Sequence, residues 1–131
     1  MFTAEFKSAS EAKTFFESLG SLISEIQLRV SSEGFSIETI DAAHICFVTA
    51  YLRPNFFAKF EHEGEEDVLG LVVDDLVKIM KRSKARDTVT FQITESGDKL
   101  IVKMKGERSR ARRFTVGLNA VDQEDVNAER L

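Results

Sequence analysis

The sequence has few of the residues that disulfide bonds and zinc sites need. It contains one cysteine, Cys46, which cannot form a disulfide within the chain, and two histidines, His44 and His62. Neither histidine has a second histidine or the cysteine at the spacing of zinc ligands. Cys46 lies in an apolar run, which favours a buried structural thiol over a reactive one. These absences argue against a disulfide-stapled domain and against a zinc site.

Signals for membrane insertion, export and catalysis are missing as well. No segment approaches the roughly 20 apolar residues that a membrane-spanning helix needs. Residues 1–7 lack the basic start and apolar core of a secretory signal, so we expect a cytosolic or nuclear protein. The chain has neither a glycine-rich phosphate loop nor the Gly-x-Ser-x-Gly turn of a hydrolase. We therefore expect no metal, no cofactor and no catalytic residue, and interpret the chain as a binding module.

The length and the charge pattern indicate what is present. The 131 residues suffice for one domain with a hydrophobic core, and are too few for two domains of ordinary size. The net charge is −4, but acidic residues gather at 61–67 and basic ones at 78–86 and 108–113. This separation permits one positive surface on a molecule that is acidic elsewhere.

Hydrophobic periodicity predicts two helices and a series of strands. Ser8 and Glu11 have the spacing of a capping box, so we expect a helix over 9–19. Asp74 is expected to cap a second helix that ends near Ser83. Alternating or short bounded apolar runs predict strands at 2–7, 25–31, 34–40, 45–53, 57–61, 68–72, 87–94, 99–105 and 111–118.

This order of elements predicts the fold class. One strand, a helix, five strands, a second helix and three strands (β-α-β5-α-β3) are typical of an α+β domain. We expect an antiparallel β-sheet with two helices packed on one face. Residues 1–120 are predicted to form the domain, and residues 121–131, which are polar and acidic, a connector or tail.

The predicted outer faces of the helices carry several cations. They are Lys13 on the first helix and, on or after the second, Lys78, Lys81, Arg82, Lys84 and Arg86. One interpretation is an ordinary solvated helix face, since exposed lysine and arginine are common and cations suit the end of a helix. The other is a surface that follows a phosphate backbone without reading bases. The residues alone leave both interpretations open.

Two neighbouring runs resemble a known family. They are Ser31-Ser32-Glu33-Gly34-Phe35-Ser36-Ile37 and Thr39-Ile40-Asp41-Ala42-Ala43-His44-Ile45. They resemble, at the same spacing, the Ser-Ser-x-Gly and Met/Ile-Asp-x-x-His segments of the proliferating-cell nuclear antigen family, the DNA sliding clamps. Similarity extends along the chain and includes the basic stretch 110–114, which looks archaeal.

The resemblance implies a fold and a function. A subunit of this family has two such domains joined by a connector, and three subunits close a ring around duplex DNA, with helices lining the hole. It implies that this chain is the first domain of a non-catalytic DNA polymerase processivity factor, present as a fragment or as a one-domain clamp. Implied partners are duplex DNA, bound without sequence specificity, other clamp subunits, and DNA polymerase, flap endonuclease, DNA ligase and clamp loader. The enzymes would bind through Gln-x-x-apolar-x-x-aromatic-aromatic motifs, in the cytoplasm of an archaeon or in a eukaryotic nucleus.

The resemblance also implies three sets of site residues. The DNA-facing set is Lys13, Lys78, Lys81, Arg82 and Lys84. The client-peptide pocket is formed by Ile40, His44 and Phe47, with Val121 and Val126 from the connector. The subunit interface is the strand edge with Arg110, Arg112, Arg113 and Phe114.

Two other functions fit parts of the sequence. One is a stand-alone protein-interaction domain that never meets DNA. The other is a small enzyme that uses His44 with Asp41 as acid and base, although no nucleophile or substrate-orienting group accompanies the pair. His44 is equally compatible with a local structural role.

Overall fold

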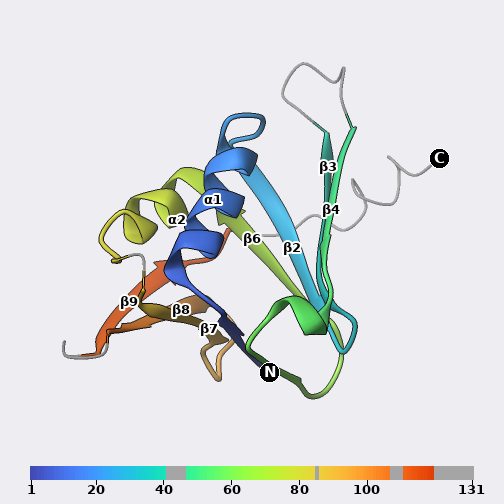
Figure 1. Ribbon diagram of the computed structural model, residues 1–131. Helices are drawn as coiled ribbons and strands as arrows, with labels where there is room; N and C mark the ends of the chain where they lie inside the picture. Colours follow the sequence, from blue (N-terminus) through green and yellow to red (C-terminus); the bar gives the residue numbers. More distant parts are fainter. Residues whose placement is uncertain (41–46, 85, 107–110, 120–131) are drawn as a thin grey trace.

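The computed structural model describes residues 1–40, 47–84, 86–106 and 111–119 (Figure 1). Its two α-helices are α1 (Ala9–Gly20) and α2 (Val73–Met80), and a short 3-10 helix spans Pro54–Phe56. The strands are β1 (Phe2–Phe6), β2 (Glu25–Ser31), β3 (Gly34–Ile40), β4 (Phe47–Leu52), β5 (Lys59–His62), β6 (Asp67–Val72), β7 (Thr88–Ile93), β8 (Lys99–Lys105) and β9 (Arg112–Gly117).

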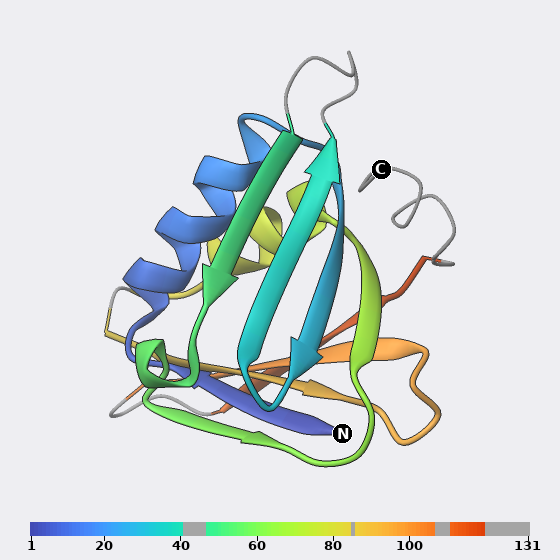
Figure 2. The ribbon, with the colours of Figure 1, turned by 90° about the vertical axis from the view of Figure 1, so that its right-hand side faces the viewer.

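The strands form two antiparallel sheets. One has five strands in the order β5-β1-β7-β8-β9, and the other has four in the order β4-β3-β2-β6. The sheets meet at an angle, and α1 and α2 lie side by side inside it (Figure 1). Figure 2 shows the four-stranded sheet with both helices on its far side. The α+β class and the predicted order of elements are confirmed. The strands divide between two sheets where one was expected, because alternation along a strand does not specify its neighbours.

Helix α1 begins where the sequence predicts. The Ser8 Oγ accepts a hydrogen bond from the Glu11 amide at 3.2 Å, which satisfies one of the unpaired amides of the first turn. Its inward positions at helical spacing are all buried: Ala9, Ala12, Phe16 and Leu19. The opposite face is left for solvent or a partner.

Helix α2 corrects the predicted cap. It begins at Val73, so Asp74 lies inside the first turn and the N-cap position is Val72, which makes no side-chain capping bond. The Val73 amide instead donates to the Ser24 carbonyl at 2.9 Å. A tertiary hydrogen bond therefore replaces the local cap that the sequence suggested. The helix ends at Met80, before Ser83.

A cluster of phenylalanines joins α1 to both sheets. Phe91 of β7 lies 5.1 Å from Phe6 of β1 and 5.6 Å from Phe16 of α1, between ring centroids. Its ring also lies 6.3 Å from that of Phe35, on β3 of the other sheet. Aromatic pairs at such distances add about 0.5–1.5 kcal/mol each beyond the burial of their area. One core thus fixes the helices relative to the sheets.

Two glycines allow close backbone contacts. Gly34, after the β2–β3 turn, has a φ of 108°, and a Cβ there would lie 2.1 Å from the Leu52 carbonyl oxygen. A Cβ on Gly70 of β6 would lie 2.7 Å from the carbonyl oxygen of Asn119, whose amide donates to the Gly70 carbonyl at 2.9 Å. The chain after β9 therefore crosses from one sheet to the edge of the other.

Candidate nucleic-acid and subunit interfaces

The cations on the helices themselves are paired with acids. The Nζ of Lys13 lies 3.9 Å from Glu17 Oε1 on α1, and that of Lys78 lies 3.3 Å from Asp74 Oδ2 on α2. Each acid is one helical turn from its lysine. Exposed pairs of this kind contribute about 0.3–0.5 kcal/mol, so they are easily exchanged for another anion. The charges of Lys13 and Lys78 are nevertheless partly neutralised by these neighbouring acids.

The segment between α2 and β7 carries unpaired cations. We call Lys81, Arg82, Lys84 and Arg86 the basic turn; all four are exposed. None of them forms a salt bridge with any described residue, in contrast to the lysines on the helices. The Ala9 amide donates to the Asp87 carbonyl at 2.9 Å, so the start of α1 lies beside the end of this turn. Among the described residues, the largest unpaired positive charge near the helices is therefore at this end of the domain.

A buried carboxylate holds the basic turn. Asp87 is the one charged residue that is buried in the described part of the chain, with 2% of its surface exposed. Its Oδ2 accepts hydrogen bonds from the Lys84 amide at 2.9 Å and from Arg112 Nη2 at 3.0 Å. The Nη1 of Arg112 donates to the Arg82 carbonyl at 2.8 Å. Arg112, on β9, thus binds both ends of the turn.

The turn and the predicted interface strand share further contacts. The guanidinium carbon of Arg82 lies 5.6 Å from the centre of the Phe114 ring on β9, within the range of a cation–π interaction. Arg82, predicted to face DNA, and Phe114, predicted to face a subunit, are therefore neighbours. Arg113 is exposed and pairs in register with Lys103 of β8. Arg110 lies outside the described residues.

Strand β9 is the end of its sheet. In the order β5-β1-β7-β8-β9 it has β8 on one side and no described strand on the other. Its open edge presents backbone groups that another strand can bind, which is the geometry that the predicted subunit contact requires. The functional residue that the sequence did not reveal is Asp87, which was expected only to begin the strand 87–94. The one sequence feature that could have pointed to it is a single acidic residue directly after the basic segment 81–86.

Little of the predicted client pocket falls within the described residues. Ile40 at the end of β3 and Phe47 at the start of β4 are partners in register, so their backbones lie side by side. Their side chains lie outside what the structure describes, as do His44, Val121 and Val126. The enzyme pair His44 and Asp41 and the thiol of Cys46 also lie outside it. These assignments stay predictions.

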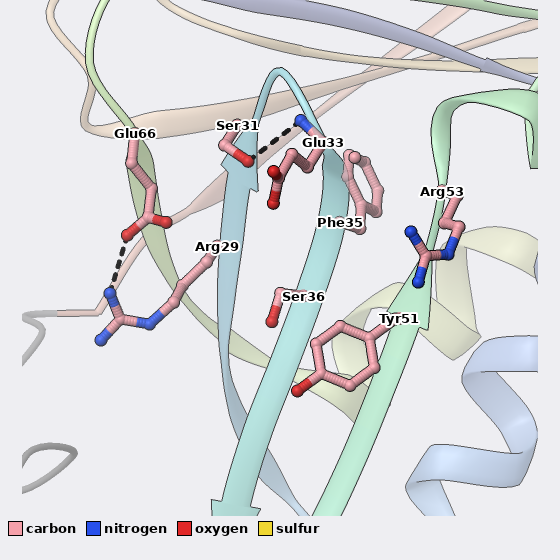
Figure 3. Close-up of a pocket in the computed structure, with 9 residues that line it drawn as sticks. Arg29, Ser31, Glu33, Phe35, Ser36, Tyr51, Arg53 and Glu66 are labelled. Atoms are coloured by element: carbon pink, nitrogen blue, oxygen red, sulfur yellow. Dashed lines mark hydrogen bonds and ion pairs between the residues drawn. The ribbon is translucent and has the colours of Figure 1, made fainter.

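A hollow lies at the opposite end of the β2–β3 hairpin. It encloses about 370 Å³, and its lining includes Arg29, Ser31, Glu33, Tyr51, Arg53 and Glu66. Arg29 of β2 reaches Glu66, with 2.8 Å between Nη1 and Oε1, while Tyr51 on β4 and Arg53 just after it line the other side of the hollow (Figure 3). Because the lining holds charges of both signs, it offers a polyanion much less than the basic turn does.

The other histidine has structural neighbours. The side chain of His62 is 3% exposed, and its Nε2 lies 3.3 Å from Asp67 Oδ2, which the Met1 ammonium approaches to 3.2 Å. Within the described ranges, no three histidine, cysteine or acidic side chains gather as metal ligands. In the same residues, no helix is both long and apolar enough to cross a membrane.

Comparison with known families shows which family the chain belongs to. Residues 1–127 match the model of the family "Proliferating cell nuclear antigen, N-terminal domain". The chain belongs to this family. The resemblance drawn from residues 31–45 is therefore confirmed, and the two sheets with two helices are the fold of a clamp domain.

Relatives within the clamp family include DNA polymerase sliding clamps of archaea. The chain is 30% identical over 124 residues to the DNA polymerase sliding clamp of Methanothermobacter thermautotrophicus, covering 95% of this chain and 49% of the relative. It is 30% identical over 128 residues to that of Pyrococcus horikoshii, covering 98% and 49%. It is 28% identical over 130 residues to the clamp of Pyrococcus abyssi, and the match covers 99% of this chain and 51% of the relative. The chain spans about half the length of the curated relatives it matches.

Proposed function

We propose that this chain is the first domain of a DNA sliding clamp, a non-catalytic processivity factor whose ring encircles duplex DNA and tethers enzymes to it. The observation that supports this most is the match of residues 1–127 to the N-terminal clamp family. The domain itself would comprise residues 1–120, and residues 121–131 would begin the connector to the rest of the ring.

The DNA contact would be electrostatic. Lys13, Lys78, Lys81, Arg82 and Lys84 would line the hole and neutralise phosphates without gripping a base, which lets a ring slide. The unpaired charges of the basic turn favour Lys81, Arg82 and Lys84 as the stronger part of this set. Salt-dependent binding of duplex DNA tests this half of the proposal, and its absence would favour a stand-alone interaction domain.

Subunit contact would use the open edge of β9. Arg112, Arg113 and Phe114, with Arg110 before them, would meet the second domain of the next subunit by strand addition. Such a head-to-tail contact joins two different surfaces and closes into a ring when the rotation between subunits allows it. The arginines would also discourage the open edge from pairing with copies of itself.

Client enzymes would bind on the outer face. DNA polymerase, flap endonuclease, DNA ligase and clamp loader would insert a Gln-x-x-apolar-x-x-aromatic-aromatic segment into a pocket of Ile40, His44 and Phe47, closed by Val121 and Val126. We place the protein in the cytoplasm of an archaeal cell, or in the nucleus if its source is eukaryotic.

A peptide titration tests the client pocket. We expect a peptide of the Gln-x-x-Ile/Leu-x-x-Phe-Phe type to bind the 131-residue chain weakly. NMR spectra recorded during the titration should show movement of the amide signals of Ile40, His44 and Phe47. The same peptide with its two aromatic residues replaced by alanine is the control. If these signals stay still, or move equally with the control peptide, the pocket assignment is wrong.

A further inference from the structure

The link between β9 and the basic turn suggests a role that neither surface has alone. Arg112 is the only described β9 residue with a hydrogen bond from its side chain to the turn, and it makes two, to Asp87 Oδ2 and to the Arg82 carbonyl. The Arg112 side chain is about two-fifths exposed, whereas the Asp87 side chain is 3% exposed. The buried acid is thus satisfied by one residue from the edge strand and by the Lys84 amide of the turn.

The network fixes the backbone on which the cations stand. The Asp87 amide donates to the Lys84 carbonyl at 2.9 Å, and Asp87 Oδ2 receives the Lys84 amide in return at 2.9 Å. The Arg82 side chain is held against Phe114 of β9. Hydrogen bonds to a buried charge are about twice as strong as neutral ones, and losing a partner there is correspondingly costly. A substitution of Arg112 will therefore alter the hydrogen bond of the Lys84 amide.

We propose that Arg112 and Asp87 are positioning residues that hold the basic turn in the geometry in which it binds the DNA backbone. This inference rests on the proposed function, because it assigns the turn to DNA and β9 to the next subunit. Arg112 then has a second task besides any contact of its own at the subunit edge.

Conservative substitutions of adjacent arginines separate positioning from charge. Arg112→Lys keeps the charge and removes the guanidinium fork that reaches Asp87 and the Arg82 carbonyl together. Arg113→Lys is the matched control, because Arg113 is the exposed neighbour on the same strand. Asp87→Asn and Asp75→Asn form a second pair with equal changes in net charge, since Asp75 is exposed on α2.

The experiment uses the 131-residue chain and a duplex DNA oligonucleotide at several salt concentrations. We expect Arg112→Lys to shift the amide signals of Lys84 and Asp87, and to weaken DNA binding by about threefold to tenfold relative to Arg113→Lys. Asp87→Asn should bind DNA more weakly than Asp75→Asn, although both variants gain the same charge. A fall in the slope of binding against salt should accompany both losses, because fewer phosphates are neutralised.

The outcomes distinguish this inference from the proposed function. Unmoved Lys84 and Asp87 signals in Arg112→Lys, or equal DNA affinities within each pair, would overturn the positioning role. If the unaltered chain binds no DNA at any salt concentration, the DNA part of the proposed function fails and the purpose assigned to the turn fails with it. If the amide signals nevertheless shift in Arg112→Lys, then Arg112 and Asp87 only stabilise the structure of the turn.

Discussion

Two turns of this domain are each closed by an aspartate, and they differ in what the aspartate binds. In the turn before β7, Asp87 is buried and bonds the Lys84 amide and Arg112 of another strand. In the turn between β7 and β8, Asp98 is exposed and accepts hydrogen bonds from Ser96 and Thr94. One turn is anchored to the edge of the sheet, and the other is closed by its own residues.

The difference shows how a loop acquires a function. A self-contained turn needs only local hydrogen bonds, so its neighbours are free to vary. The basic turn instead places its cations relative to a strand 25 residues further along the chain, as the separation of Asp87 from Arg112 indicates. Its geometry depends on tertiary structure, which is what a surface that must match a partner requires.

Replacing each of the two aspartates by alanine should give the largest difference between the two turns. We expect Asp87→Ala to lower the free energy of unfolding by about 2–4 kcal/mol, because two hydrogen bonds to a buried carboxylate disappear. Asp98→Ala should change it much less, since Asp98 is exposed and its partners can bond water instead. Urea unfolding followed by circular dichroism measures both. Equal losses would mean that the buried network adds nothing beyond ordinary turn closure.

Single lysine substitutions should sharpen the contrast between free and paired cations. We expect Lys81→Ala to reduce DNA affinity and to lower the slope of log affinity against log salt by about 0.9, the value for one phosphate contact. Lys13→Ala should have a smaller effect, because Lys13 is paired with Glu17 on its own helix. Fluorescence anisotropy with labelled duplex DNA provides both quantities. A larger effect at Lys13 would relocate the main contact to α1.

The fold was largely predictable because its signals are local. The β2, β3 and β8 boundaries coincide with the predicted ranges 25–31, 34–40 and 99–105, and Ser8 caps α1 as its spacing indicates. The predicted cap of α2, Asp74, was wrong because the Ser24 carbonyl, distant in sequence, accepts the hydrogen bond of the first helical amide. The division into two sheets depends on pairing partners such as β1 between β5 and β7, which alternation within a strand does not encode.

The candidate site was predictable only in part. Lys81, Arg82, Arg112 and Phe114 were identified through the family resemblance, but as members of two separate surfaces. The structure brings Arg82 into contact with both Arg112 and Phe114, and it links Arg112 to the buried Asp87. A buried acid that organises surrounding cations depends on burial and on a long-range hydrogen bond, and neither has a pattern in sequence.

The smallest expected effect concerns pH at the self-contained turn. Hydrogen bonds from Ser96 and then Thr94 lower the pKa of Asp98 below its ordinary value of 3.8. A carboxyl group whose pKa is lower in the folded state stabilises the fold above its unfolded pKa, and this stabilisation is lost as pH falls through the folded pKa. We therefore expect the difference in melting temperature between the unaltered chain and Asp98→Asn to shrink as pH falls below 3.8. Thermal unfolding on either side of that pH measures it, with Glu95→Gln as a control in the same turn. A difference that stays constant across this range would show that the carboxylate of Asp98 does not contribute through its charge.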